Sequence, residues 1–237
     1  MILSNSCYLK NKCYKYNKKD KTCQDCAMFC PKLFRTDFLL SEALIPDNQK
    51  PYLPLVIDLD GTDREEFLFL KAIENNILDF VKSGKNLYIH SKNTGTGKSS
   101  WAIRLIQAYI DKIWYSSDLV CKALFINVPR FLLDLKDNIS NKSEYIEHIK
   151  KYALSADVVV FDEVATKTMT QFEHENILSI INARIDMGKS NIYTSNVSGE
   201  ELREKMGDRL FSRIFKFSDV VEFHGSDKRG LAGGNIN

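Results

Sequence analysis

The stretch "YIHSKNTGTGKSSWA" (residues 88–102) constrains the fold more than any other part of the chain. It places a glycine-rich turn with Lys98 between an apolar segment, residues 86–90, and an amphipathic segment that begins at Ser99. Such a turn binds phosphate when a strand precedes it and a helix follows, because the N–H groups at the helix N-terminus then face the phosphates. The sequence therefore predicts a strand, a phosphate-binding loop and a helix in this order.

The loop departs at one position from the pattern G-x-x-x-x-G-K-[ST], since Lys92 stands where the first glycine is usual. This position is at the loop's entrance, where a side chain can point outward, whereas Gly95 and Gly97 lie where the backbone curls around the β-phosphate. Lys98 would reach the β- and γ-phosphates, and Ser99 would hold Mg²⁺ through its hydroxyl. We expect the nucleotide to contact Asn93, Thr94, Gly95, Thr96, Gly97, Lys98, Ser99 and Ser100.

A second motif, residues 158–163, consists of four apolar residues followed by Asp162 and Glu163. Such a strand presents its carboxylates at its C-terminal end, where open α/β sheets bind ligands. Asp162 would orient Mg²⁺ through water, and Glu163 would polarise the water that attacks the γ-phosphate. The alternative is a surface acidic pair at the end of a core strand. Together with the lysine loop, the acids predict binding of ATP or GTP.

Helix and strand patterns alternate after residue 60, which predicts an α/β fold: a P-loop parallel sheet with helices on both faces. The first helix is expected to begin with a capping box, Thr62 with Glu65. Strands are expected at residues 86–90, 122–128, 157–163, 190–196 and 219–224. Helices are expected at residues 62–83, 99–113, 129–139, 143–154, 171–187 and 199–217, the last as one helix or two.

The composition divides the chain into four parts. Five of the six cysteines lie within residues 1–45, which we expect to form a small zinc-binding domain. Residues 46–59 contain three prolines and are expected to be a linker. Residues 60–225 would form the nucleotide-binding domain, and the glycine-rich residues 226–237 a flexible tail that frays.

The chain carries a net charge of +2, but residues 1–35 hold eight Lys and Arg against two Asp. This basic segment is either a solvated face or a surface for nucleic acid or an acidic partner. Because the chain shows neither a signal peptide nor an apolar run of roughly 18 residues, we expect a cytoplasmic protein without membrane contact.

In a reducing cytosol, clustered cysteines favour a metal over disulfides. Zinc takes four ligands, and closely spaced cysteine pairs supply half-sites. Cys7 with Cys13 and Cys26 with Cys30 make one pairing, whereas Cys23 with Cys26 and Cys30 makes another. An iron–sulfur cluster on the same thiolates and a metal-free segment are the alternatives. Cys121 is expected to be a buried small hydrophobe.

Three further residues help to indicate which class of nucleotide-binding protein this is. Asn196 ends the segment "NIYTSN", where its amide would position water or sense the γ-phosphate, or else cap the next helix. Arg184 and Arg213 lie in predicted helices and would ordinarily be exposed there.

The order of these signals resembles the AAA+ ATPases of the bacterial replicative helicase loader type (DnaC and DnaI) and their initiator relatives. The resemblance rests on the lysine loop, the strand ending in Asp-Glu, "TSN" and "RLFSRI", and it covers about residues 60–225. The loop region together with the N-terminal cysteines is most similar to phage and prophage members. The resemblance implies an ATP-dependent protein that self-associates around single-stranded DNA and delivers a replicative DNA helicase.

By position, the resemblance assigns Lys98 and Ser99 to the Walker A motif and Asp162 and Glu163 to Walker B. It makes Asn196 the sensor-1 residue. Further assignments implied by the resemblance are an arginine finger acting on a neighbouring subunit (Arg213), an arginine recurring before the sensor-1 strand (Arg184), a vestigial sensor-2 (Arg229), zinc ligands (Cys7, Cys13, Cys26, Cys30) and DNA-contacting cations (Arg130, Lys136, Lys142, Lys150, Lys151).

Two alternative functions remain. A transposition-target regulator of the same AAA+ branch would have the same ATPase core. A P-loop nucleotide kinase belongs to a different class, and a kinase has no use for an arginine that acts between subunits.

Overall fold

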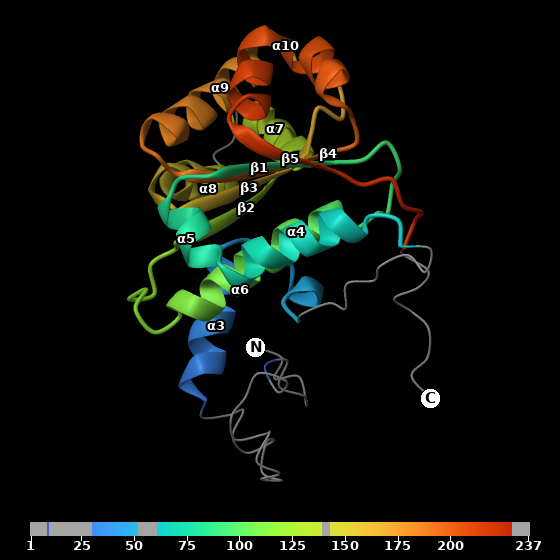
Figure 1. Cartoon of the computed structure of the whole chain (residues 1–237). Helices are drawn as coiled ribbons and strands as arrows, with labels where there is room; N and C mark the ends of the chain where they lie inside the picture. The colour runs from blue at the N-terminus through green and yellow to red at the C-terminus, as the bar shows by residue number, and fades with distance from the viewer. Residues whose placement is uncertain (1–8, 10–29, 52–60, 139–142, 229–237) are drawn as a thin grey trace.

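The computed structural model describes residues 9, 30–51, 61–138 and 143–228. Its centre is a five-stranded sheet, which lies between the helices in Figure 1. The strand order is β2-β3-β4-β1-β5, and every neighbouring pair is parallel. The strands are β1 (Asn86–His90), β2 (Ala123–Asn127), β3 (Val158–Val164), β4 (Ser190–Ser195) and β5 (Ser218–Glu222). The predicted α/β fold with a parallel P-loop-type sheet is confirmed.

Helices cover both faces of the sheet, as parallel sheets require. One layer contains α3 (Pro31–Glu42), α4 (Arg64–Asn75), α5 (Ile77–Lys82) and α6 (Lys98–Ile113). The other contains α7 (Val128–Asp137), α8 (Glu144–Ser155), α9 (Gln171–Asp186) and α10 (Gly199–Phe215). A short 3₁₀ helix, η2 (Asp47–Gln49), follows α3.

Alternate residues of each strand belong to opposite cores. Leu87 and Ile89 of β1 pack in the core beneath α6, whereas Tyr88 between them packs in the core beneath α10. This period of two is the geometry of an extended strand. It explains why the strands read as continuous apolar runs in the sequence.

The predicted helix over residues 62–83 differs from the structure in two ways. The chain leaves the helical path at Asn76, so α4 and α5 are separate helices. The Thr62–Glu65 capping box is wrong, because the N-cap residue is Asp63, which has a left-handed φ of 64° and makes no side-chain cap. The Asp63 carboxylate instead accepts hydrogen bonds from the backbone N–H groups of His224 (2.7 Å) and Gly225 (2.9 Å).

The expected helix over residues 199–217 is interrupted once. Gly207 has non-helical angles (φ 76°, ψ 164°) and divides α10 into two segments. Glycine adopts this conformation without steric cost. Of the two alternatives, two consecutive helical segments are therefore correct.

Residues 31–45, which we expected within the Cys-rich unit, pack with the sheet. Leu39, Leu40 and Ala43 lie in the core shared with α6. The Ala43 carbonyl accepts a hydrogen bond from the Phe125 N–H of β2 (2.8 Å). The apolar residues of α3 thus attach this helix to the sheet. The predicted domain boundary at residue 45 stays a prediction.

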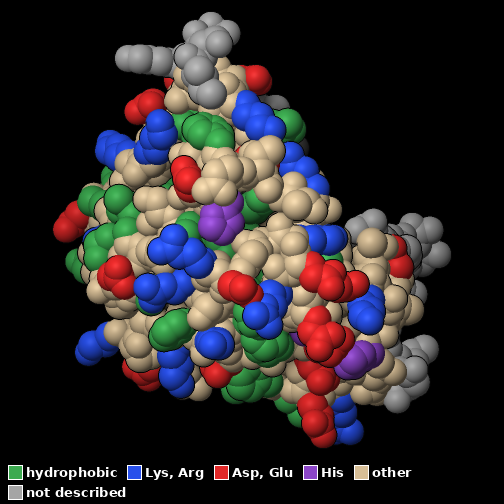
Figure 2. All heavy atoms as spheres, turned by 90° about the horizontal axis from the view of Figure 1, so that it is seen from above, with side chains coloured by type: hydrophobic (Ala, Val, Ile, Leu, Met, Phe, Trp, Pro, Cys, Tyr) green, Lys and Arg blue, Asp and Glu red, His purple; other side chains and the backbone are tan. Residues whose placement is uncertain are grey.

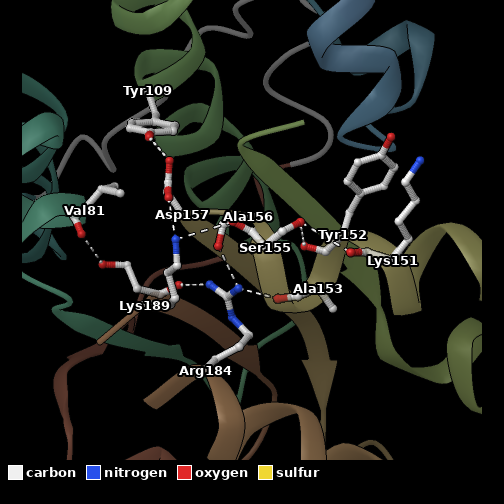
Figure 3. A network of polar contacts seen from close by, with 11 residues as sticks. Val81, Tyr109, Lys151, Tyr152, Ala153, Ser155, Ala156, Asp157, Arg184 and Lys189 are labelled. Atoms are coloured by element: carbon white, nitrogen blue, oxygen red, sulfur yellow. Dashed lines mark hydrogen bonds and ion pairs between the residues drawn. The ribbon is translucent and has the colours of Figure 1, made fainter. Parts of the chain in front are cut away.

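Arg184 is the largest fully buried side chain of the described residues, contrary to the expectation of an exposed helix arginine. Its guanidinium donates to the carbonyls of Ala153 and Ala156 (2.9 Å), as Figure 3 shows. It also donates to the Ser190 carbonyl (2.6 Å) and to Asn191 Oδ1 (2.6 Å). These acceptors join the end of α8 to the start of β4. Burial lowers the pKa of Arg184 to about 10, so the side chain stays charged at neutral pH.

We predict that Arg184→Met lowers the free energy of unfolding by at least about 3 kcal/mol. The methionine fills most of the space but leaves several buried carbonyl oxygens without donors, each costing roughly 1–3 kcal/mol. Urea unfolding measures the change, with the exposed Arg209→Met of α10 as the control. A loss below about 1 kcal/mol would show that the network contributes little.

Candidate nucleotide-binding site

The phosphate-binding loop connects β1 to α6, as its sequence predicts. Its two glycines have left-handed backbone angles, with φ of 72° at Gly95 and 99° at Gly97. Gly97 is the N-cap residue of α6, so the first N–H groups of a helix of 16 residues face the loop. A Cβ at Gly95 would also collide with the carboxylate of Asp227. Both glycines are therefore required by the geometry.

Lys92 at the entrance of the loop is exposed, and its backbone does not adopt a left-handed conformation. The position therefore does not need glycine. The presence of Lys92 in place of the usual glycine leaves the curled part of the loop, from Gly95 to Gly97, in the form that phosphate binding requires.

Lys98 is the first residue of α6 and is 8% exposed. Its Nζ donates to the Asn93 carbonyl (2.9 Å) and lies 3.4 Å from Thr96 Oγ1. The Lys98 ammonium group thus lies over the phosphate-binding loop, where it would contact the phosphates of a bound nucleotide. Asn93 itself lies outside the cavity lining, since its amide donates to the carbonyls of His224 (3.2 Å) and Gly225 (3.0 Å).

A cavity of about 160 Å³ opens at this end of the sheet. Typical ligand pockets hold ~300–1,000 Å³, so the cavity accounts for the phosphate end of a nucleotide. Its lining combines three segments of the chain at the carboxyl ends of β1, β3 and β4. The lining residues are Thr94, Gly95, Thr96, Gly97, Lys98, Ser99, Ser100, Glu163, Thr194, Ser195 and Asn196.

Asp162 and Glu163 lie at the carboxyl end of β3, as predicted, but in different surroundings. Asp162 is 5% exposed and accepts a hydrogen bond from Thr194 Oγ1 (2.6 Å). Burial raises the pKa of Asp162, and hydrogen bonds from the hydroxyls of Thr194 and Ser99 oppose this shift. Glu163 is exposed and lines the cavity.

The donor set at this point fits Mg²⁺. The Ser99 hydroxyl acts on the Asp162 carboxylate by lowering its pKa, so candidate oxygen ligands from β3 and α6 face the same place. Mg²⁺ takes oxygen ligands and usually binds through one or two carboxylates together with substrate phosphates. A cation here would also compensate the burial of the Asp162 charge.

Polar residues of the site that were not identified from the sequence include Asn127 and Thr194. Asn127 ends β2, and its Nδ2 lies 3.4 Å from Glu163 Oε2 while its Oδ1 accepts from the Arg130 N–H (3.1 Å). Thr194 lies at the end of β4, beside Asp162. Each is a polar residue at the carboxyl end of a strand, and this was the signal in the sequence.

The remaining predicted site residues lie in three different places. Asn196 lines the cavity and is exposed, so its amide is available to a ligand. Arg213 lies elsewhere, in a second hollow of about 430 Å³ that it shares with Arg209, Asn182 and Phe217 between α9 and α10. Arg184 is in neither place, because its buried contacts are at the amino end of β4.

Most of the predicted DNA-contacting cations already have partners. Arg130 stacks on the Tyr145 ring (4.5 Å) and Lys136 pairs with Glu173 (3.1 Å). Lys151 lies over Tyr152 (4.9 Å), and Lys150 is 3.9 Å from Glu147. The face above α9 and α10 carries Lys and Arg interspersed with Asp and Glu (Figure 2). Lys142 and Arg229 lie outside the described residues.

The predicted zinc ligands Cys7, Cys13 and Cys26, together with Cys23, lie outside the described residues. Cys30 is described; it is a free thiol at the N-cap of α3. Within residues 9, 30–51, 61–138 and 143–228, His, Cys, Asp and Glu side chains form no metal-binding group of three or more. Cys121 is buried, as predicted, and burial raises the pKa of its thiol to about 12.

No helix in the described part of the chain combines the length and apolar character that crossing a bilayer requires.

The C-terminal residues up to Lys228 pack on the site, where the Lys228 N–H donates to the Gly95 carbonyl (2.9 Å). The flexible tail expected at residues 226–237 stays a prediction.

A parallel sheet of this order, with a lysine loop after β1 and two adjacent acids at the carboxyl end of β3, defines a P-loop AAA+ domain. Residues 69–230 match the family of IstB-like ATP binding proteins, and the chain belongs to this family. It is 24% identical over 146 residues to the replicative helicase loader DnaC of Escherichia coli (strain K12), which covers 62% of this chain and 54% of DnaC. The chain thus spans about half the length of the curated relatives it matches.

Two solved structures share the fold. The crystal structure of DnaI has a TM-score of 0.59 at 19% identity and covers 80% of this chain and 100% of DnaI. The replication initiator DnaA, bound to AMPPCP and single-stranded DNA, has a TM-score of 0.57 at 18% identity and covers 76% of this chain and 50% of DnaA. The chain is therefore an IstB-like ATP-binding protein that is similar in sequence to DnaC and shares its fold with DnaI and DnaA.

Proposed function

We propose that the protein is an ATPase that loads a replicative ring helicase onto single-stranded DNA. The observation that carries the ATPase part is the single cavity in which the lysine loop, Glu163 and Asn196 meet. The DNA and helicase parts are supported by the relatives, since DnaC is a helicase loader and DnaA was solved with single-stranded DNA.

The residues divide the chemistry among them. The N–H groups of the loop and the Lys98 ammonium would hold the β- and γ-phosphates. Ser99 and Asp162 would hold Mg²⁺, which supplies charge neutralisation on the phosphate oxygens. Glu163 would accept a proton from the attacking water, and the Asn196 amide would orient that water.

We predict that Lys98→Ala weakens ATP binding by about 10- to 100-fold, because it removes a charged hydrogen-bond donor worth roughly 1.5–3 kcal/mol. Glu163→Gln should bind ATP normally and hydrolyse it about 100-fold more slowly or worse, because the general base is lost. Fluorescence titration and phosphate release measure the two effects. Lys92→Ala is the matched control, since this lysine of the same loop is exposed. Wild-type hydrolysis by Glu163→Gln would refute the role of Glu163.

The loader assignment is tested by measuring ATP hydrolysis with and without single-stranded DNA, and by capture of the replicative helicase on the full chain. Stimulation by DNA together with helicase binding supports the loader. Stimulation without helicase binding indicates the transposition-target regulator instead. Turnover that requires a nucleotide acceptor would identify a kinase, which the family membership does not favour.

Arg213 is proposed as an arginine finger acting on a neighbouring copy, because it lies in a hollow outside its own nucleotide cavity. Arg213→Ala should bind ATP normally and hydrolyse it about 10³-fold more slowly. Mixing it with Lys98→Ala protein should recover part of the activity, since intact sites then meet intact arginines. Arg209→Ala, one turn earlier in α10, is the control. No recovery at any mixing ratio would contradict action between subunits.

We also propose that one zinc ion is bound by Cys7, Cys13, Cys26 and Cys30, because closely spaced cysteines supply zinc half-sites and the resemblance to phage members favours this set over one that includes Cys23. Metal analysis of the purified full chain should give one zinc per chain. Cys26→Ser should lose it, whereas Cys23→Ser should keep it. Loss of zinc in Cys23→Ser would instead favour the ligand set that includes Cys23.

A further inference from the structure

The two acids of the site lie opposite a single residue of the neighbouring strand. Phe161 pairs with Tyr193 and Val164 pairs with Ser195, so Asp162 and Glu163 together face Thr194. Two residues against one is a β-bulge, which bends a strand and re-aims its side chains. In a regular strand, consecutive side chains point to opposite faces. The bulge therefore determines where Glu163 points relative to Asp162.

The backbone of the bulge is in an unusual conformation. Glu163 has a φ of 60°, in the left-handed region. This conformation costs an L-residue about 1–2 kcal/mol, so neighbouring contacts must hold it. The contact at this point is the Glu163 N–H, which donates to Thr194 Oγ1 (2.9 Å).

The Thr194 hydroxyl also contacts the second acid, since Oγ1 lies 2.6 Å from Asp162 Oδ1. A backbone N–H can only donate, so the hydroxyl accepts from Glu163 and directs its one proton to the Asp162 carboxylate. Thr194 is 1% exposed, so water does not replace these partners. One buried hydroxyl thus joins the backbone of Glu163 to the side chain of Asp162.

We propose that Thr194 is a positioning residue for hydrolysis, which fixes both the metal-binding acid and the general base through this single hydroxyl. The proposal rests on the ATPase function proposed above. Thr194 touches neither the phosphates nor the attacking water in this role, and it acts through Asp162 and Glu163. A merely structural threonine would affect stability and leave the two acids in place.

The test compares Thr194→Val, which keeps the shape and removes the hydroxyl, with Thr194→Ser, which keeps the hydroxyl. The valine variant should lower kcat at least ~10-fold while KM for ATP changes less than ~3-fold, because small displacements of reacting groups are costly. The serine variant should stay within ~3-fold of the wild type in both.

A second readout does not depend on turnover. Mg²⁺ is titrated into the full chain with a fluorescent, non-hydrolysable ATP analogue, and the half-saturating Mg²⁺ concentration is measured. Thr194→Val should need about 10-fold more Mg²⁺, as when the partner of a metal ligand is removed elsewhere. Thr194→Ser should match the wild type.

The proposal is overturned if Thr194→Val behaves as the wild type in both assays, or if Thr194→Ser is as impaired as Thr194→Val. If thermal melting shows that Thr194→Val is not folded, Thr194→Ala replaces it in the same comparison. A wild type that binds the analogue without hydrolysing ATP contradicts the proposed function alone, and the Mg²⁺ titration still decides the role of Thr194.

Discussion

The parallel direction of all five strands is the constraint on which the site depends. Because the strands run the same way, their carboxyl ends meet at one edge of the sheet. The strand order then places β4 between β1 and β3. The lysine loop after β1 and the acids of β3 therefore lie on either side of the end of β4, where Thr194 and Asn196 are found.

Helix α6 connects this edge to the interior. Its N-terminus forms the phosphate end of the cavity, while Ala102, Leu105 and Ile106 are fully buried against the sheet. Burial of a large aliphatic side chain stabilises a fold by roughly 1.5–3 kcal/mol. The same helix that would bind the phosphates is thus fixed by the core, so the loop is held in place before any ligand binds.

The sequence predicted the elements and the principal acids because these depend on local patterns. The strand at residues 86–90, the loop and the acids at 162 and 163 each have a distinct signal within a few residues. Thr194 had only the general signal of a polar residue at the end of a strand, because its importance arises from the two-against-one register between β3 and β4. Register between parallel strands depends on residues far apart in the chain, and a local pattern does not contain it.

Asp63 and Arg184 show the same limit of local patterns, because for each of them the local pattern made a prediction that the structure contradicts. Asp63 follows a sequence that favours a capping box at Thr62, yet its carboxylate is engaged by the N–H groups of His224 and Gly225. Arg184 lies near the end of a helix, where a charged residue is usually exposed, yet buried carbonyls surround its guanidinium. In both cases partners from distant segments outweigh the local preference.

We propose that one site at the carboxyl edge of the sheet binds the phosphates of ATP between the lysine loop and the acids of β3. The most direct measurement is the electron density of the full chain crystallised with Mg²⁺ and a non-hydrolysable ATP analogue. We expect the γ-phosphate beside Lys98, with the metal near Ser99 and Asp162. Phosphate density away from the loop, or a metal bound without Asp162 or Ser99 nearby, would contradict it.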